Sequence, residues 1–154
     1  MLKINGARLW DSLMEMAKIG ATPEGGVSRV AVSEEDRLGR DLLRSWATPF
    51  VEDYHFDEMG NMFFVRHGLQ PKSPMILTGS HLDTQIHGGR FDGAFGVMAG
   101  LEVLRTLVEE DIRLPYGIGL VAWTNEEEAC YCPAMGSAVF VGKQSLQSAL
   151  DCVG

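Results

Sequence analysis

The sequence is poor in cysteine, in basic runs and in long apolar stretches. Three cysteines are an odd number in 154 residues, which does not suit a disulfide framework, so we expect reduced, inert thiols in a cytoplasmic protein. No apolar stretch reaches the roughly 18 residues of a membrane span, and residues 1–13 lack the apolar core of a signal peptide. The 13 basic and 21 acidic residues give a net charge of −8, which argues against nucleic acid and anionic membranes as partners.

The composition that remains is typical of one globular domain. Hydrophobic residues make up 45% of the chain and charged residues 22%, enough apolar material for a core without disulfide or metal support. Strand–helix–strand order at the centre of the chain predicts an α/β fold, a helix-flanked, mostly parallel mixed sheet with a right-handed crossover. The expected helices are 5–19, one that Ser33 caps and Pro49 stops, 93–108, 134–142 and 143–150, and the expected strands are 50–57, 62–66, 75–78 and 116–123.

Ionisable residues gather where the two buried strands end. The first strand runs into residues 79–84 (GSHLDT), the second runs into 124–128 (TNEEE), and 90–93 (RFDG) stands where a loop becomes a helix. Ligands of open α/β sheets bind outside the carboxyl ends of the strands. We therefore expect the three segments to meet at one edge of the sheet if the two strands are near neighbours.

The residue types in these segments suit a metal site, although each has a simpler interpretation. His81 and Asp83 lie on one face of an extended chain, and a metal-bound imidazole usually gives its second N–H to a carboxylate; the alternative is a surface polar pair. Asp92 is either a bridging carboxylate or the N-cap of the following helix. The acidic triplet 126–128 is either a solvated loop or part of the site, in which one Glu binds metal and another takes a proton from water.

Two long blocks identify the chain by resemblance. TGSHLDTQIHGGRFDGAFGVMAGLEVLRTL and LVAWTNEEEACYCPAMGSAVFVG resemble signature blocks of the N-carbamoyl-L-amino-acid hydrolases, whose close relatives are β-ureidopropionase and allantoate amidohydrolase. INGARLW, IGATPEGG and MGNMFF are similar to the N-terminal region of that family. The broader group is the dinuclear-metal amidohydrolases and exopeptidases of the aminoacylase type.

The resemblance implies a role for each site residue. His81 would bind one metal ion, Asp92 would bridge two, Glu127 would bind the second, Asp83 would orient His81, and Glu126 would be the general base that activates water. The metals would be zinc, manganese, cobalt or nickel. The reaction would be hydrolysis of a linear amide or ureido C–N bond in an N-carbamoyl-L-amino acid, N-carbamoyl-β-alanine or allantoate. The substrate-binding residues stay unknown.

The resemblance also implies that residues 1–154 are the N-terminal part of a catalytic domain. The dimerisation or lid domain, which makes the family homodimeric, and the later metal ligands would lie outside these residues, so the chain alone is expected to be inactive. Two departures stand inside the second block, since the family usually has Gly where Glu128 stands and Arg where Cys130 stands. Glu128 would be strained if that Gly has a positive φ.

Two other interpretations stay open. One is a non-catalytic remnant or partner subunit with an incomplete metal site. The other is an aminopeptidase or dipeptidase on the same scaffold. The eleven-residue step from His81 to Asp92 and the TNEEE segment resemble the carbamoylase branch, because the step is generally longer in the peptidases.

Overall fold

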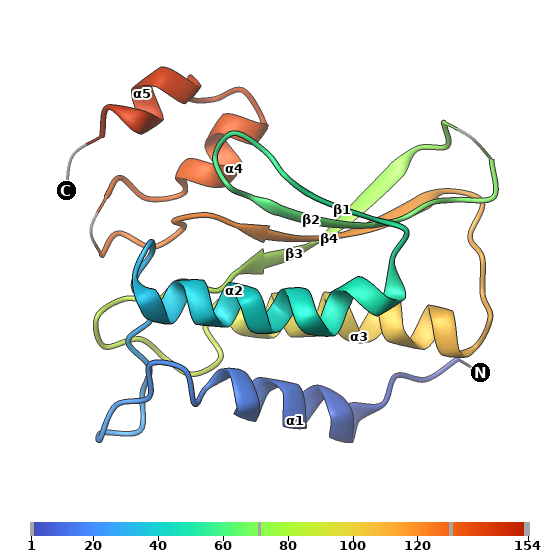
Figure 1. The fold of residues 1–154 in the computed structure, drawn as a ribbon, viewed down its shortest axis with the longest axis horizontal. Coiled ribbons are helices and arrows are strands. Elements are labelled where there is room, and N and C mark those ends of the chain that lie inside the picture. The colour runs from blue at the N-terminus through green and yellow to red at the C-terminus, as the bar shows by residue number, and fades with distance from the viewer. Residues whose placement is uncertain (1, 71, 130, 153–154) are drawn as a thin grey trace.

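The computed structural model describes residues 2–70, 72–129 and 131–152. In these residues four strands form one sheet, with the longer helices on one of its sides (Figure 1). The elements in chain order are α1 (Gly6–Met16), α2 (Glu34–Ala47), the 3₁₀ turn η1 (Thr48–Phe50), β1 (Asp53–Phe56), β2 (Met62–Arg66), β3 (Met75–His81), α3 (Ala94–Glu109), β4 (Gly117–Trp123), α4 (Met135–Phe140) and α5 (Leu146–Leu150).

The sheet is mixed and has the strand order β1-β2-β4-β3. β3 and β4 are parallel and are joined through α3, whereas β1 with β2 and β2 with β4 are antiparallel. The expected helix-flanked α/β fold is confirmed, but "mostly parallel" is wrong for the described residues. The β1–β2 hairpin lies with β2 beside β4, so the antiparallel β2–β4 pairing is at the centre of the sheet.

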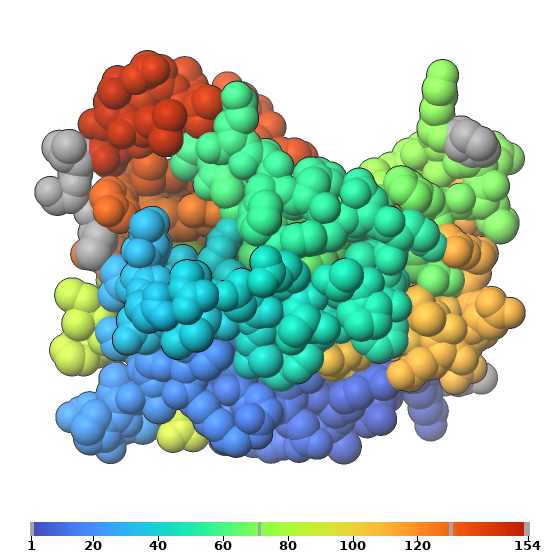
Figure 2. Space-filling view, in the orientation of Figure 1, coloured from blue at the N-terminus to red at the C-terminus, as the bar shows by residue number. Residues whose placement is uncertain are grey.

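Local signals in the sequence set the starts of the first two helices. The Asn5 side chain accepts a hydrogen bond from the backbone N–H of Arg8, and the Ser33 side chain accepts one from Asp36. Each cap satisfies a helix N–H group that has no partner within the helix. α1 and α2 form the lower part of the face shown in space-filling form, and the β1–β2 hairpin and α5 lie above them (Figure 2).

The main hydrophobic core lies between the sheet and the three long helices. From α3 it takes Met98, Leu101 and Leu104, and from the sheet Phe64 and Leu120, all with no exposed surface. Burying each such side chain stabilises the fold by roughly 1.5–3 kcal/mol. α3 is the longest helix at 16 residues, and none in the described part of the chain is both long and apolar enough to cross a bilayer.

The other face of the sheet carries a second, smaller cluster. Phe63, Val65 and Val121 are its buried members. Phe140 of α4 packs against Phe63 and Trp123, with ring centroids 5.5 and 5.1 Å apart. α4 therefore covers this face beside the carboxyl end of β4.

β3 is longer than the sequence predicted. The expected strand 75–78 extends to His81, because Gly79, Ser80 and His81 pair with Val121, Ala122 and Trp123 of β4 in parallel register. Pairing with a buried neighbour overrides the weak strand preference of glycine and serine. As a result His81 is the last residue of β3 and stands opposite the last residue of β4.

Other boundaries differ by a few residues. The expected strand 50–57 begins only at Asp53, because Pro49 lies in a 3₁₀ turn that ends at Phe50. The short helices expected at 134–142 and 143–150 shrink to Met135–Phe140 and Leu146–Leu150. The strand 62–66 has the expected bounds.

The expectation of reduced thiols is wrong for two of the cysteines. Cys132 and Cys152 form a disulfide across 20 residues of sequence, and the backbone N–H of Cys132 lies 3.1 Å from the sulfur of Cys152. An odd number of cysteines leaves open which two meet, and α4 and α5 bring these two together. Cys130 lies outside the described residues.

Asn61 ties the hairpin to the end of β4. It is fully buried. Its Oδ1 accepts a hydrogen bond from the Thr124 N–H at 2.9 Å, and its Nδ2 donates to the Gly136 carbonyl at 3.0 Å and to Asp57 Oδ2 at 2.7 Å. One amide thus joins the β1–β2 turn, the chain that leaves β4, and α4.

We predict that Asn61→Ala lowers the free energy of unfolding by about 2–4 kcal/mol, because it leaves a buried N–H and a buried carbonyl without partners. The matched control is Asn5→Ala, which removes an exposed N-cap and costs about 1 kcal/mol. Urea unfolding followed by tryptophan fluorescence measures both. An equal or smaller loss for Asn61→Ala would contradict the prediction.

Candidate metal centre

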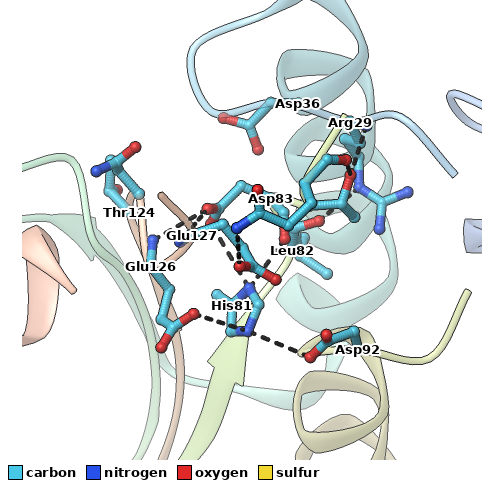
Figure 3. Close-up of polar contacts among 12 residues, drawn as sticks. Arg29, Asp36, His81, Leu82, Asp83, Asp92, Thr124, Glu126 and Glu127 are labelled. Carbon is cyan, nitrogen blue, oxygen red and sulfur yellow. Dashed lines mark hydrogen bonds and ion pairs between the residues drawn. The ribbon is translucent and has the colours of Figure 1, made fainter. Parts of the chain in front are cut away.

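The three polar segments meet where β3 and β4 end and α3 begins (Figure 3). His81 comes from the last position of β3, Asp92 from the loop before α3, and Glu127 from the loop after β4. One ligand atom from each of these residues lies within 4.8 Å of the others. The structure thus brings together all three residues that the sequence nominated as metal ligands.

The orientation of His81 leaves one ring nitrogen open to a cation. The ring is buried, and its Nδ1 lies 2.9 Å from the backbone carbonyl oxygen of Asp83. Because a carbonyl can only accept, this contact requires the hydrogen on Nδ1, and Nε2 is the ring nitrogen that faces the acidic residues. Nε2 lies 3.4 Å from Glu126 Oε2 and 3.9 Å from Asp92 Oδ1.

Asp83 acts on the site differently from the sequence expectation. The sequence placed its carboxylate on His81, but the carbonyl makes that contact and Oδ1 is 3.8 Å from Nδ1. Oδ2 instead accepts hydrogen bonds from the backbone N–H groups of Glu126 and Glu127, each at 3.0 Å. Burial raises the pKa of the Asp83 carboxyl, while the Glu127 N–H and His81 act in the opposite direction.

The acidic loop after β4 is held from both sides. Its backbone turns at Asn125, which has a left-handed φ of 51°, and the Glu126 carbonyl accepts a hydrogen bond from Ala134 at 2.8 Å. Glu127 Oε2 accepts one from Gln85 Nε2 at 2.6 Å. Glu128 is exposed and is not among the residues with positive φ, so the strain expected there is absent.

Asp92 is the most exposed of the candidate ligands, with 62% of its side chain accessible. The alternative that it serves as the N-cap of α3 is not borne out, because Gly93 holds that position and no side chain caps the helix. Its carboxylate is therefore not committed to the helix and points toward His81 (Figure 3).

The donor set fits a divalent cation. The His81 imidazole and the oxygens of Asp92 and Glu127 converge, with the Glu126 carboxylate beside them, so three carboxylates gather around one imidazole. Imidazole and carboxylate together suit zinc, manganese, cobalt and nickel. The group is thus a possible metal-binding site.

Sequence reasoning missed the residues that support this group. Gln85, which contacts Glu127, follows His81 by four positions, and its surroundings in the sequence indicate only a loop. Asn61, which fixes the start of the acidic loop, is expected from the sequence only as a turn residue. Neither carries a sequence signal beyond its place in a motif, since both act through contacts across the fold.

Comparisons with known proteins agree with this fold. The N-carbamoyl-L-amino-acid amidohydrolase of Rhizobium meliloti is 45% identical over 96% of this chain, and that of Geobacillus stearothermophilus is 38% identical over 97%. The crystal structure of a hydantoinase/carbamoylase family amidase from Burkholderia ambifaria superposes with a TM-score of 0.95 at 51% identity over 99% of the chain.

The match covers only part of each relative. The chain spans 36% of the length of each of the two amidohydrolases and 38% of the amidase. A family model described as peptidase family M28 matches residues 64–153, which include all five candidate site residues and more than half of the chain. The chain belongs to peptidase family M28.

Proposed function

We propose that the protein containing this chain is a metal-dependent amidohydrolase that cleaves a linear amide or ureido C–N bond. Its substrates are N-carbamoyl-L-amino acids or related ureido acids such as N-carbamoyl-β-alanine and allantoate. The observation that carries the proposal is the convergence of His81, Asp92 and Glu127 within 4.8 Å, with Glu126 3.4 Å from His81 Nε2. The names of the similar amidohydrolases support this reaction class.

Each ligand has a distinct task in this proposal. His81 would hold one of two divalent ions, Glu127 would hold the other, and Asp92 would contribute to the binding of both. Bound zinc, manganese, cobalt or nickel supplies Lewis-acid polarisation of the scissile carbonyl and lowers the pKa of water. Asp83 keeps His81 in the required tautomer through its carbonyl and fixes the acidic loop through its carboxylate.

Glu126 is the proposed general base. Its carboxylate lies beside the candidate ligands, and 42% of the side chain is accessible, so it can reach both water and substrate. It accepts a proton from the attacking water and returns it to the leaving nitrogen. For an N-carbamoyl amino acid the products are the amino acid, carbon dioxide and ammonia.

A peptidase is the second candidate, because the matching family model describes peptidases. The same ligands and base hydrolyse peptide and ureido bonds by similar steps. The two reactions differ in the carboxylate of the substrate and in the groups around the leaving nitrogen.

From the family resemblance we also propose that the complete protein contains the later metal ligands and a dimerisation domain, and that it is a homodimer.

The test is hydrolysis by the complete protein, loaded with manganese or zinc. The panel is an N-carbamoyl-L-amino acid, N-carbamoyl-β-alanine, allantoate and a dipeptide. Chelator-sensitive release of ammonia from a ureido acid, with little cleavage of the dipeptide, supports the proposal. Cleavage of the dipeptide alone would replace it with the peptidase, and no chelator-sensitive turnover would overturn both.

We predict that Glu126→Gln in the complete protein lowers turnover by about 10²-fold or more and leaves metal bound, since only the proton acceptor is lost. Glu127→Gln is the matched control, which removes a ligand oxygen and weakens metal binding. Ammonia release and calorimetric metal titration measure the pair. Metal loss in Glu126→Gln and retention in Glu127→Gln would reverse the assignment.

Gly93 leaves room for the His81 ring. Its φ is +63°, and a Cβ added there would lie 2.5 Å from both Cε1 and Nε2 of His81. Gly142 has a similar φ of +73°, but a Cβ added at that residue would meet no atom within 4 Å. The two glycines therefore share the backbone requirement and differ in what surrounds them.

We predict that Gly93→Ala lowers divalent metal affinity about tenfold or more by displacing the imidazole. Gly142→Ala carries a similar backbone penalty of about 1 kcal/mol and leaves metal affinity unchanged. Calorimetry with zinc measures the affinities, and circular dichroism checks the fold. Equal affinities in the two variants would contradict the prediction.

The chain of 154 residues alone is predicted to be catalytically silent and to bind zinc and manganese weakly. Two ions that share one carboxylate need about five protein ligands with water, and the described residues supply the group His81, Asp92 and Glu127. Calorimetry and an ammonia assay on residues 1–154 measure this. Sub-micromolar binding of two ions would show that the site is complete within them.

A further inference from the structure

Arg29 is a fully buried arginine in the loop between α1 and α2. Its Nε donates to the Leu82 carbonyl at 2.7 Å, and its Nη1 donates to the carbonyls of Met16 and Ile19 at 3.1 and 3.0 Å. One guanidinium therefore binds the carboxyl end of α1 to the residue that follows β3. Leu82 is the residue between His81 and Asp83.

The backbone of Arg29 holds the same segment a second time. Its N–H donates to Thr84 Oγ1 at 2.8 Å, and its carbonyl accepts from the Thr84 N–H at 2.8 Å. Leu82 and Thr84, the residues on either side of Asp83, are thus both hydrogen-bonded to Arg29. Asp83 in turn carries the carbonyl that orients His81 and the carboxylate that holds the acidic loop.

The charge of Arg29 also faces this segment. Asp36 and Asp83 are the carboxylates that attract it, and both are buried. A buried guanidinium is strongly disfavoured unless carbonyls and opposite charges surround it. A neutral side chain at this position leaves three carbonyls without their donor and leaves the two carboxylates without their nearby cation.

We propose that Arg29 is a positioning residue of the hydrolytic site. It fixes the peptide segment 82–84 and so sets the direction of the His81 imidazole and the Asp83 carboxylate, although it contacts no candidate ligand atom itself. The inference rests on the proposed function for its catalytic consequence. Its structural part, the orientation of His81, is independent of any reaction.

The competing explanation is that Arg29 only stabilises the core. Arg66 is the matched control, because it is also buried and donates from Nη2 to a carbonyl, that of Ile112, at 2.8 Å. Arg66 pairs with Ile118 of β4, and Ile118 pairs on its other side with Ile76 of β3. Ile76 precedes His81 by five residues, which is about 16 Å along β3. It therefore reports the loss of a buried arginine away from the site.

The experiment compares Arg29→Met, Arg29→Lys and Arg66→Met in the complete protein. At saturating manganese, Arg29→Met is expected to lower kcat about 10–100-fold with little change in KM, and to weaken metal binding by a similar factor. Arg29→Lys recovers part of both, since an ammonium donates to carbonyls without the planar fork. Arg66→Met lowers stability and leaves kcat and metal affinity unchanged.

A measurement on the metal-free protein separates this inference from the proposed function. Nitrogen NMR of the His81 ring is expected to show one tautomer, protonated at Nδ1, in the unaltered protein and in Arg66→Met. Arg29→Met is expected to show a mixture of tautomers. If the unaltered protein hydrolyses no ureido acid, the proposed function fails, but the tautomer still decides the role of Arg29.

Thr84→Val keeps the inference testable if Arg29→Met does not fold. It removes the hydroxyl that accepts from the Arg29 N–H at nearly constant volume, and the expected effects are smaller but in the same direction. An unchanged tautomer, metal affinity and kcat in the folded variants would overturn the inference. So would losses in Arg66→Met as large as those in Arg29→Met.

Discussion

The site depends on one residue, Asp83, which bonds to both of the segments that meet there. Its carbonyl fixes the His81 ring at the end of β3, and its carboxylate accepts the N–H groups of Glu126 and Glu127 beyond the end of β4. A buried carboxylate loses hydration, and these donors compensate for part of that loss. Because β3 and β4 are parallel neighbours, a single residue can span the gap between their ends.

Long apolar segments made most of the fold predictable from sequence. Strand 62–66, α3 and β4 are runs of mostly buried residues. The length of each run and the turns that flank it indicate whether it is a strand or a helix. β3 was underestimated because Gly79 and Ser80 have low intrinsic strand preference, and their extended state comes from pairing with β4. The direction of the hairpin relative to β4 is likewise a non-local choice that no local pattern records.

The candidate site was predictable in its members but not in its contacts. The sequence nominated His81 and Glu127 because they lie at the ends of strands, and Asp92 because it precedes a helix. The topology of an open α/β sheet places such positions at one edge. Whether Asp83 contacts His81 by its carboxylate or by its carbonyl depends on a local turn of the chain. No sequence pattern indicated Arg29, which lies in a loop, because its hydrogen-bond partners are 53 and 55 residues away in the chain.

The site separates buried positioning groups from accessible ligand oxygens. Arg29 and Asp83 are buried and hydrogen-bonded within the network behind His81, whereas 62% of Asp92 and 42% of Glu126 remain accessible. Three carboxylates gathered in a dry pocket would repel one another strongly. Contact of the oxygens with water limits that repulsion, while the buried hydrogen bonds hold the His81 ring and the acidic loop in place. The groups that set the direction of the His81 ring are therefore buried, whereas the carboxylate oxygens beside that ring are accessible to water.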